Sequence, residues 1–83
     1  MNKYELASLV SREGLNNGKL TASKQRELFG FVIAGQKDIR FDSRDQGTVT
    51  IGKAVNGHDY VSRDYSYEEF ARCVSNQQKV EAW

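Results

Sequence analysis

Two short segments in the middle of the chain alternate between apolar and polar residues, which is the period of a half-buried β-strand. The apolar members are Ile39 and Phe41 in the first segment and Val49 and Ile51 in the second. If the chain turns through residues 44–46, Phe41 lies opposite Val49, and all four apolar side chains share one face of an antiparallel pair. A slip of one residue would turn that face towards water, so this register constrains the fold more than any other feature of the sequence.

A third strand is predicted directly after the second one. The pair Asn56-Gly57 accepts the positive φ values that a type I′ turn needs, so the segment from Val55 to His58 is predicted to form a tight hairpin. The strand that follows is expected to cover residues 58–63. The three strands then form an antiparallel meander, with residues 38–43 at one of its two edges.

Two helices are predicted before this meander. The first covers residues 3–13, because Asn2 is a favourable N-cap and Gly14 is typical of the position just past a helix end. The second begins behind Thr21 as its cap and is expected to end at Gly35. Its apolar half, LFGFVIA, is also compatible with a buried strand, since a short apolar run is ambiguous by period alone. The cap and the strong helix formers before the run favour the helix.

A last helix is predicted at residues 67–78. Ser66 and Glu69 have the spacing of a capping box, and apolar residues recur behind them on one helical face. The whole order predicts an α+β fold with two N-terminal helices, a three-stranded antiparallel meander and a C-terminal helix. The apolar residues of the last helix are Tyr67, Phe70, Ala71 and Val74.

Length and composition predict one compact globular domain over residues 1–83. Hydrophobic residues make up 39% of the chain and charged residues 28%, and a chain of 83 residues cannot divide its apolar side chains between two cores. The single Cys73 cannot form an internal disulfide, the N-terminus lacks the apolar region of a signal peptide, and no stretch is long enough to cross a membrane. We therefore expect a cytoplasmic protein that does not act at a membrane.

The sequence does not bring together the groups that nucleophilic catalysis requires. Cys73 as nucleophile would need His58 as its base, and a third group to orient that base. His58 follows a predicted turn, whereas Cys73 lies beside the apolar stripe of the last helix. We predict a protein that is not an enzyme.

Sets of metal or phosphate ligands are not recognisable either. An EF-hand needs alternating oxygen ligands and a distal glutamate, and a zinc site needs more than the one histidine and one cysteine present here. The glycines do not form a phosphate-binding loop. We predict no metal and no cofactor. The groups considered as ligands were Asp38, Asp42 and Asp45, and His58, Asp59 and Asp64.

Nucleic-acid binding is the alternative function that the N-terminal region allows. Two helices joined by a glycine-containing turn can form a helix-turn-helix, and basic residues gather at the start of the second helix. Two features argue against it, because the net charge is only +1 and the apolar second half of that helix is expected to face inwards. A DNA-binding regulator would make its contacts through Lys19, Ser23, Lys24 and Arg26.

Protein binding is the function that the segment HDYVSRDYSYEEF, residues 58–70, favours. Tyrosine and arginine dominate the energetics of protein interfaces. Helical spacing assigns Tyr67 and Phe70 to the core, and Tyr60 is expected on the same face as Val55. What remains is a group of polar and aromatic residues expected at the corner between the last strand and the last helix. The predicted contact residues are Asp59, Tyr60, Arg63, Asp64 and Tyr65.

These observations favour a small non-enzymatic protein that acts by occupying a surface on a larger protein or complex. Inhibitors carried by bacteriophages and other mobile elements, including anti-CRISPR and other anti-defence proteins, are similar to this chain in size and economy, and no motif carries the comparison. Such an inhibitor would work in the cytoplasm of the host cell. Homo-oligomerisation stays open, because the predicted meander has two edges.

Overall fold

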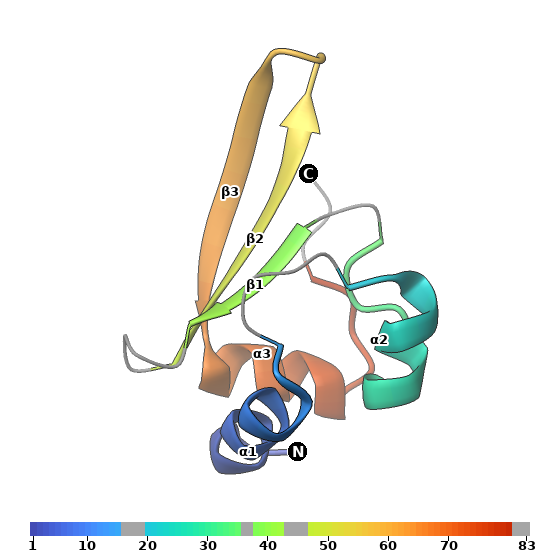
Figure 1. The fold of residues 1–83 in the computed structure, drawn as a ribbon, viewed down its shortest axis with the longest axis vertical. Helices are drawn as coiled ribbons and strands as arrows, with labels where there is room; N and C mark the ends of the chain where they lie inside the picture. Colours follow the sequence, from blue (N-terminus) through green and yellow to red (C-terminus); the bar gives the residue numbers. More distant parts are fainter. Residues whose placement is uncertain (16–19, 36–37, 43–46, 81–83) are drawn as a thin grey trace.

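The computed structural model of the protein describes residues 1–15, 20–35, 38–42 and 47–80. Within them, three helices and a three-stranded antiparallel sheet confirm the predicted α+β fold and its order. Figure 1 shows the helices gathered at one end of the sheet, while the last two strands run on together away from them. The elements are α1 (Lys3–Glu13), α2 (Ala22–Phe29), β1 (Asp38–Asp42), β2 (Thr48–Val55), β3 (Asp59–Ser66) and α3 (Tyr67–Ser75).

The register between β1 and β2 is the one that the alternating pattern predicts. Phe41 pairs with Val49 and Ile39 pairs with Ile51. All four side chains are at most 2% exposed, so they lie on the face of the sheet that the helices cover. The strand order β1-β2-β3 leaves β1 at one edge, as expected, and β3 at the other.

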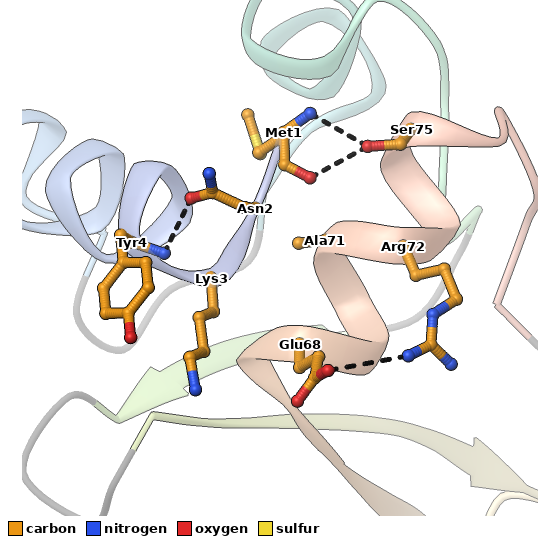
Figure 2. A pocket seen from close by; sticks show the side chains of 8 residues that line it. All are labelled: Met1, Asn2, Lys3, Tyr4, Glu68, Ala71, Arg72 and Ser75. Carbon is orange, nitrogen blue, oxygen red and sulfur yellow. Dashed lines mark hydrogen bonds and ion pairs between the residues drawn. The ribbon is translucent and has the colours of Figure 1, made fainter.

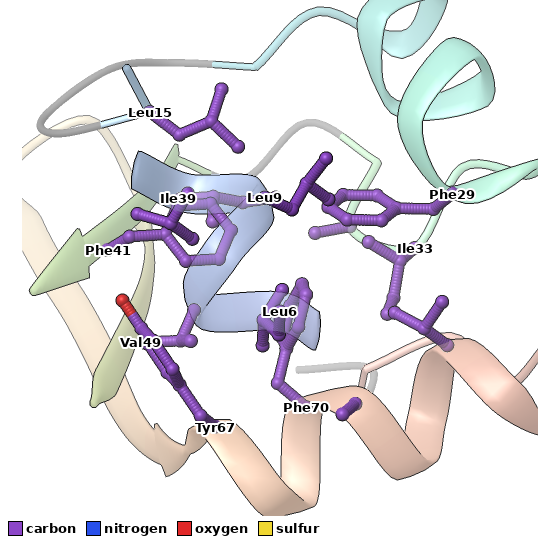
Figure 3. Close-up of a cluster of buried hydrophobic side chains, with 14 of the residues drawn as sticks. Leu6, Leu9, Leu15, Phe29, Ile33, Ile39, Phe41, Val49, Tyr67 and Phe70 are labelled. Carbon is purple, nitrogen blue, oxygen red and sulfur yellow. The ribbon is translucent and has the colours of Figure 1, made fainter. Parts of the chain in front are cut away.

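Phe70 is a fully buried member of the hydrophobic core (Figure 3). Its ring meets the Phe41 ring edge-on at 5.5 Å between centroids and the Phe29 ring at 5.7 Å. Phe70 therefore joins β1, α2 and α3, and α1 adds Leu6 to the same cluster. The core assignment of Tyr67 and Phe70 is confirmed, since they are 4% and 0% exposed.

The predicted caps of all three helices are present. The Asn2 side chain accepts from backbone N–H groups of the first turn of α1, and Gly14 ends that helix with a left-handed φ of 62°. The Thr21 side chain accepts from the Lys24 N–H at the start of α2. Ser66 and Glu69 form a complete capping box on α3.

Two of the predicted helix ends are wrong. The second helix was expected to reach Gly35, but α2 stops at Phe29 because Gly30 takes a left-handed φ of 86° and caps it. The following segment is neither helix nor strand. The last helix was expected to reach residue 78, but α3 ends at Ser75 with Asn76 as its C-cap.

Gln25 holds this irregular segment against α2. The side chain is 0% exposed. Its Nε2 donates to the carbonyl oxygens of Leu20 and Ala34 at 3.0 and 3.1 Å, and its Oε1 accepts from the N–H groups of Ile33 and Ala34 at 3.0 Å each. One amide thus supplies the hydrogen bonds that a helix or a sheet would otherwise give to a buried backbone. Ile33 and Ala34 enter the core as a result.

Several expectations fall on residues outside the described ranges. These are the glycine-containing turn between the first two helices, at residues 16–18, and the turn at residues 44–46 between the first two strands. The last described residue, Val80, is buried, and its N–H donates to the Ile33 carbonyl at 3.0 Å.

Candidate functional site

The predicted contact residues do not meet at a corner, because β3 is longer than its sequence suggested. The strand runs without interruption from Asp59 to Ser66 and passes directly into α3. At about 3.3 Å per residue, Asp59 and Tyr65 lie roughly 20 Å apart along it. The five residues are therefore spread along one strand.

The turn before β3 decides which face each of these side chains occupies. Asn56 and Gly57 have the positive φ values, 55° and 73°, that the sequence predicts for them. His58 also belongs to the loop, so Val55 pairs with Asp59 and Ala54 pairs with Tyr60. The expectation that Tyr60 shares a face with Val55 is wrong, because this one additional loop residue turns Tyr60 to the opposite face.

The hairpin reaches beyond the rest of the sheet. In the described part of the chain, β1 pairs with β2 only as far as Gly52, and from there β2 and β3 continue as a two-stranded ribbon. Figure 1 shows this ribbon projecting away from the helices along the longest axis of the molecule, which measures 36 Å. We call residues 53–61 the hairpin arm.

The outer face of the arm, which points away from the helices, carries Tyr60. Its side chain is 59% exposed, and its ring lies across Gly52 of the neighbouring strand, where a Cβ would overlap it. Nearer to α3 on the same face, Thr50 Oγ1 donates to Asp64 Oδ1 at 2.8 Å. Asp64 is thus engaged within its own sheet, whereas most of the Tyr60 ring is open to a partner.

The opposite face of β3 carries Asp59, Val61, Arg63 and Tyr65 in succession. Tyr65 packs against the hydrophobic core and is half-buried. Val61, opposite Lys53, is 40% exposed although it is apolar, and Asp59 and Arg63 are exposed on either side of it. On this face of β3, partial burial is therefore limited to Tyr65 next to α3, and the three residues towards the tip of the hairpin are exposed.

The residues proposed for nucleic-acid contact are only partly available. Lys24 Nζ lies 3.6 Å from Glu13 Oε1 and 3.5 Å from Glu27 Oε2, so two carboxylates offset its charge. Ser23 and Arg26 are exposed on α2, and Lys19 lies outside the described residues. A cluster of open positive charge at the start of α2 is not seen in the described residues.

An open hollow lies between the start of α1 and α3 (Figure 2). Its volume is about 370 Å³, and its polar groups already serve the fold: Ser75 Oγ accepts from the Met1 nitrogen at 2.9 Å, and Arg72 pairs with Glu68 at 3.7 Å. Tyr4 at its rim is 72% exposed. The residues that line the hollow are Met1, Asn2, Lys3, Tyr4, Glu68, Ala71, Arg72 and Ser75.

The groups considered for catalysis lie far apart. His58 belongs to the turn at the tip of the hairpin, and Cys73 lies in α3 at the other end of the sheet (Figure 1). Among the described residues, no group of three or more histidine, cysteine, aspartate or glutamate side chains is arranged to hold a metal ion.

Sequence reasoning missed Val61 and Tyr4 as exposed apolar side chains. Tyr4 could have been found, because the buried stripe of α1, which includes Leu6 and Leu9, leaves it on the other side of the helix. Val61 could not, since its face depends on the length of the hairpin loop.

Comparisons with protein-family models, with curated proteins and with solved structures found no match. Within the part of the chain that the structure describes, no helix has both the length and the apolar character needed to cross a membrane. The hypothesis about function therefore rests on the surfaces of the molecule, among which the hairpin arm projects away from the helices (Figure 1).

Proposed function

We propose that this protein is a non-enzymatic binding protein that acts by occupying a surface on a larger protein or complex, and that the hairpin arm makes the central contact. The observation that carries the proposal is the projection of the arm beyond the rest of the sheet. Tyr60 is 59% exposed on one face of it and Val61 is 40% exposed on the other. In most folds a packed helix or a second sheet covers such side chains, and a two-stranded ribbon without further strands or a helix is marginally stable.

The composition of the arm suits an interface. Tyrosine brings a large contact area with few rotatable bonds, and it is enriched among the residues that dominate binding energy. The Tyr60 ring lies over Gly52 and is 59% exposed, so it offers an aromatic surface to a partner. A partner that covers both faces would turn a marginal two-stranded ribbon into part of a larger packed structure.

Among binding proteins, we propose an inhibitor of the phage or mobile-element type, such as an anti-CRISPR or other anti-defence protein, working in the host cytoplasm. The support is the exposed arm, which projects from the fold with Tyr60 and Val61 open to a partner. The partner would be the host protein or complex whose surface the arm covers.

The test is affinity capture from host-cell lysate with three forms of the protein as bait. The first is the wild type, the second carries Tyr60→Ser and Val61→Ser in the arm, and the third carries Tyr4→Ser, which removes an exposed aromatic ring from α1. We expect wild type and Tyr4→Ser to recover the same stoichiometric protein, and the arm variant to recover at least about tenfold less of it. Recovery of no stoichiometric protein by any bait, or equal recovery by the arm variant, would overturn the proposal.

The helix-turn-helix regulator remains the alternative, with contacts at Lys19, Ser23, Lys24 and Arg26. No feature of the described residues favours it over the arm. A titration with generic duplex DNA decides between the two, since a DNA-binding protein binds at low salt and weakens steeply as salt rises. We expect no binding at low salt.

A further inference from the structure

β3 forms an edge of the sheet in the described part of the chain. It is eight residues long, DYVSRDYS, without proline, and its charged residues Asp59, Arg63 and Asp64 are of both signs, so they oppose a partner strand in most registers and favour one in which opposite charges meet. Beyond its ladder with β2, the described residues provide no backbone-to-backbone hydrogen bond to residues 59–65. One side of this strand therefore offers its N–H and C=O groups to another strand.

We propose that two copies of this chain associate through antiparallel pairing of their β3 edges, with the two-fold axis at Val61. In that register Val61 faces Val61 of the partner subunit. Asp59 then faces Arg63 of the partner subunit, and Arg63 faces Asp59 of the partner subunit. An apolar pair at the centre is thus flanked by two opposite-charge pairs, all on the helix-facing side of the sheet.

The neighbouring registers are poorer. Centring the axis on Arg63 places two guanidinium groups opposite each other, which is unfavourable. Centring it on Ser62 places Val61 opposite an arginine and gives no pair of opposite charges. Centring it on Tyr60 leaves Asp59 opposite Val61. The order of charges along β3 therefore selects Val61 as the axis.

The geometry of the hairpin suits this arrangement. Figure 1 shows the helices at one end of β3. Because the two β3 strands would run in opposite directions, the helical ends of the two copies would lie at opposite ends of the joint sheet, and residues 59–63 of the two copies would lie side by side. Each arm changes from a two-stranded ribbon into half of a four-stranded sheet, which is stable where an isolated hairpin is marginal. The contact is isologous, so it closes at a dimer.

Arg63 already interacts within its own chain, and a guanidinium has five donors, so it can also serve a carboxylate of the partner subunit. The outer face, with Tyr60, stays open in the dimer. Self-association therefore goes beyond the proposed binding of a larger protein, and either can fail without the other.

The test is sedimentation equilibrium from about 1 μM to about 1 mM protein, the range that spans weak to moderate affinities. Few residues pair, so we expect wild type to dimerise weakly and with clear dependence on concentration. Asp59→Arg and Arg63→Asp each replace opposite charges with like charges, and each should weaken dimerisation at least about tenfold. Arg40→Asp makes the same change of charge as Arg63→Asp at an exposed position of β1, and it should leave dimerisation unchanged.

An equimolar mixture of the two weakened variants gives the decisive result. An Asp59→Arg chain carries two arginines on its β3 edge and an Arg63→Asp chain carries two aspartates, so the mixture should recover association that neither variant shows alone. Circular dichroism checks that each variant is folded. The proposal would be contradicted if the wild type were monomeric at every concentration, or if neither single substitution weakened dimerisation. It would also be contradicted if the mixture of the two variants did not associate.

Discussion

The same two strands have opposite surroundings at their two ends. Near α3, Val49 and Ile51 of β2 are 0% exposed under the helices, whereas in the arm Tyr60 and Val61 of β3 are 59% and 40% exposed. The backbone pairing of β2 with β3 is continuous between these regions, so the two ends do not differ in their hydrogen-bonded ladder. What differs is that helices pack on the strands at one end only. The stability of the fold must therefore come mainly from the end that the helices cover.

The largest effect that separates the two ends is expected from Phe70→Ala. Phe70 is 0% exposed and touches aromatic rings from β1 and α2, so its truncation should cost about 3–5 kcal/mol of unfolding free energy. In the arm, Val61→Ala should change the free energy of unfolding by less than about 0.5 kcal/mol. Urea denaturation of both variants measures the difference, and equal losses would contradict the division into two regions.

The next effect is expected at Gln25. Replacing it with alanine removes the partners of two carbonyl groups and two N–H groups around residues 20 and 33–34, and each buried unsatisfied group costs about 1–3 kcal/mol. Local relaxation will satisfy some of them, so we expect a loss on the order of 3 kcal/mol. Gln78→Ala, at an exposed glutamine, is the control and should change stability by less than about 0.5 kcal/mol. Similar values for the two would show that Gln25 is not what fixes the segment after α2.

A smaller effect distinguishes the two glycines that lie beneath tyrosine rings. At Gly47 the φ is 76° and a Cβ would lie 2.8 Å from the buried Tyr67 ring, so Gly47→Ala should cost about 1–3 kcal/mol. At Gly52 a Cβ would displace the exposed Tyr60 ring, which can swing into solvent at little cost. Thermal unfolding should show a clear loss for Gly47→Ala and a much smaller one for Gly52→Ala. A larger loss at Gly52 would mean that Tyr60 is held as firmly as a core residue.

The smallest effect concerns the Tyr67 hydroxyl. Burial raises the pKa of Tyr67 above its ordinary value of 10.0, and the nearby Asp42 carboxylate raises it further. The folded protein then holds this proton more tightly than the unfolded chain, so this group leaves stability unchanged below pH 10.0 and lowers it as the pH rises from there towards the folded-state pKa.

Tyr67→Phe tests this predicted direction of the change in stability with pH. The hydroxyl is buried without a hydrogen-bond partner among the described residues, so its removal at neutral pH should relieve a desolvation cost and stabilise the protein by about 1 kcal/mol. Above pH 10.0 the variant should lose stability less steeply, as measured by denaturation at a series of pH values. Tyr60→Phe, in the exposed arm, is the matched control and should follow the wild type. Parallel curves for wild type and Tyr67→Phe would contradict the assignment.

Residue patterns within short segments predicted much of the structure at the end of the sheet that the helices cover. The pairing of Phe41 with Val49 follows from alternation along two short segments, and the caps at Asn2 and Ser66 follow from patterns within four residues. The end of the second helix was missed, because an apolar run does not show by itself where it leaves a helix, although Gly30 was a sign of it. The role of Gln25 depends on partners up to nine residues away and has no signal in its neighbours.

The candidate site was harder to predict than the core. Its layout depends on whether the loop after Val55 has two residues or three, and this single residue decides the face of every side chain in β3. The length of β3 was also underestimated, because the strand was predicted to stop at residue 63 and the capping box at Ser66 marks the start of α3 without showing that the strand continues up to it. Tyr60 was therefore identified by its residue type and assigned to the wrong face.

The central claim is that the arm is the weakly protected part of the fold that binding covers, and amide hydrogen exchange tests it most directly. In the dilute protein alone, we expect the amides of residues 53–55 and 59–61 to exchange many-fold faster than those of residues 49–51, and to slow when the captured partner is added. Exchange near Tyr4 should not change. An arm that is already as protected as residues 49–51 in the dilute protein, or a partner that protects α1 and leaves the arm unchanged, would contradict the account.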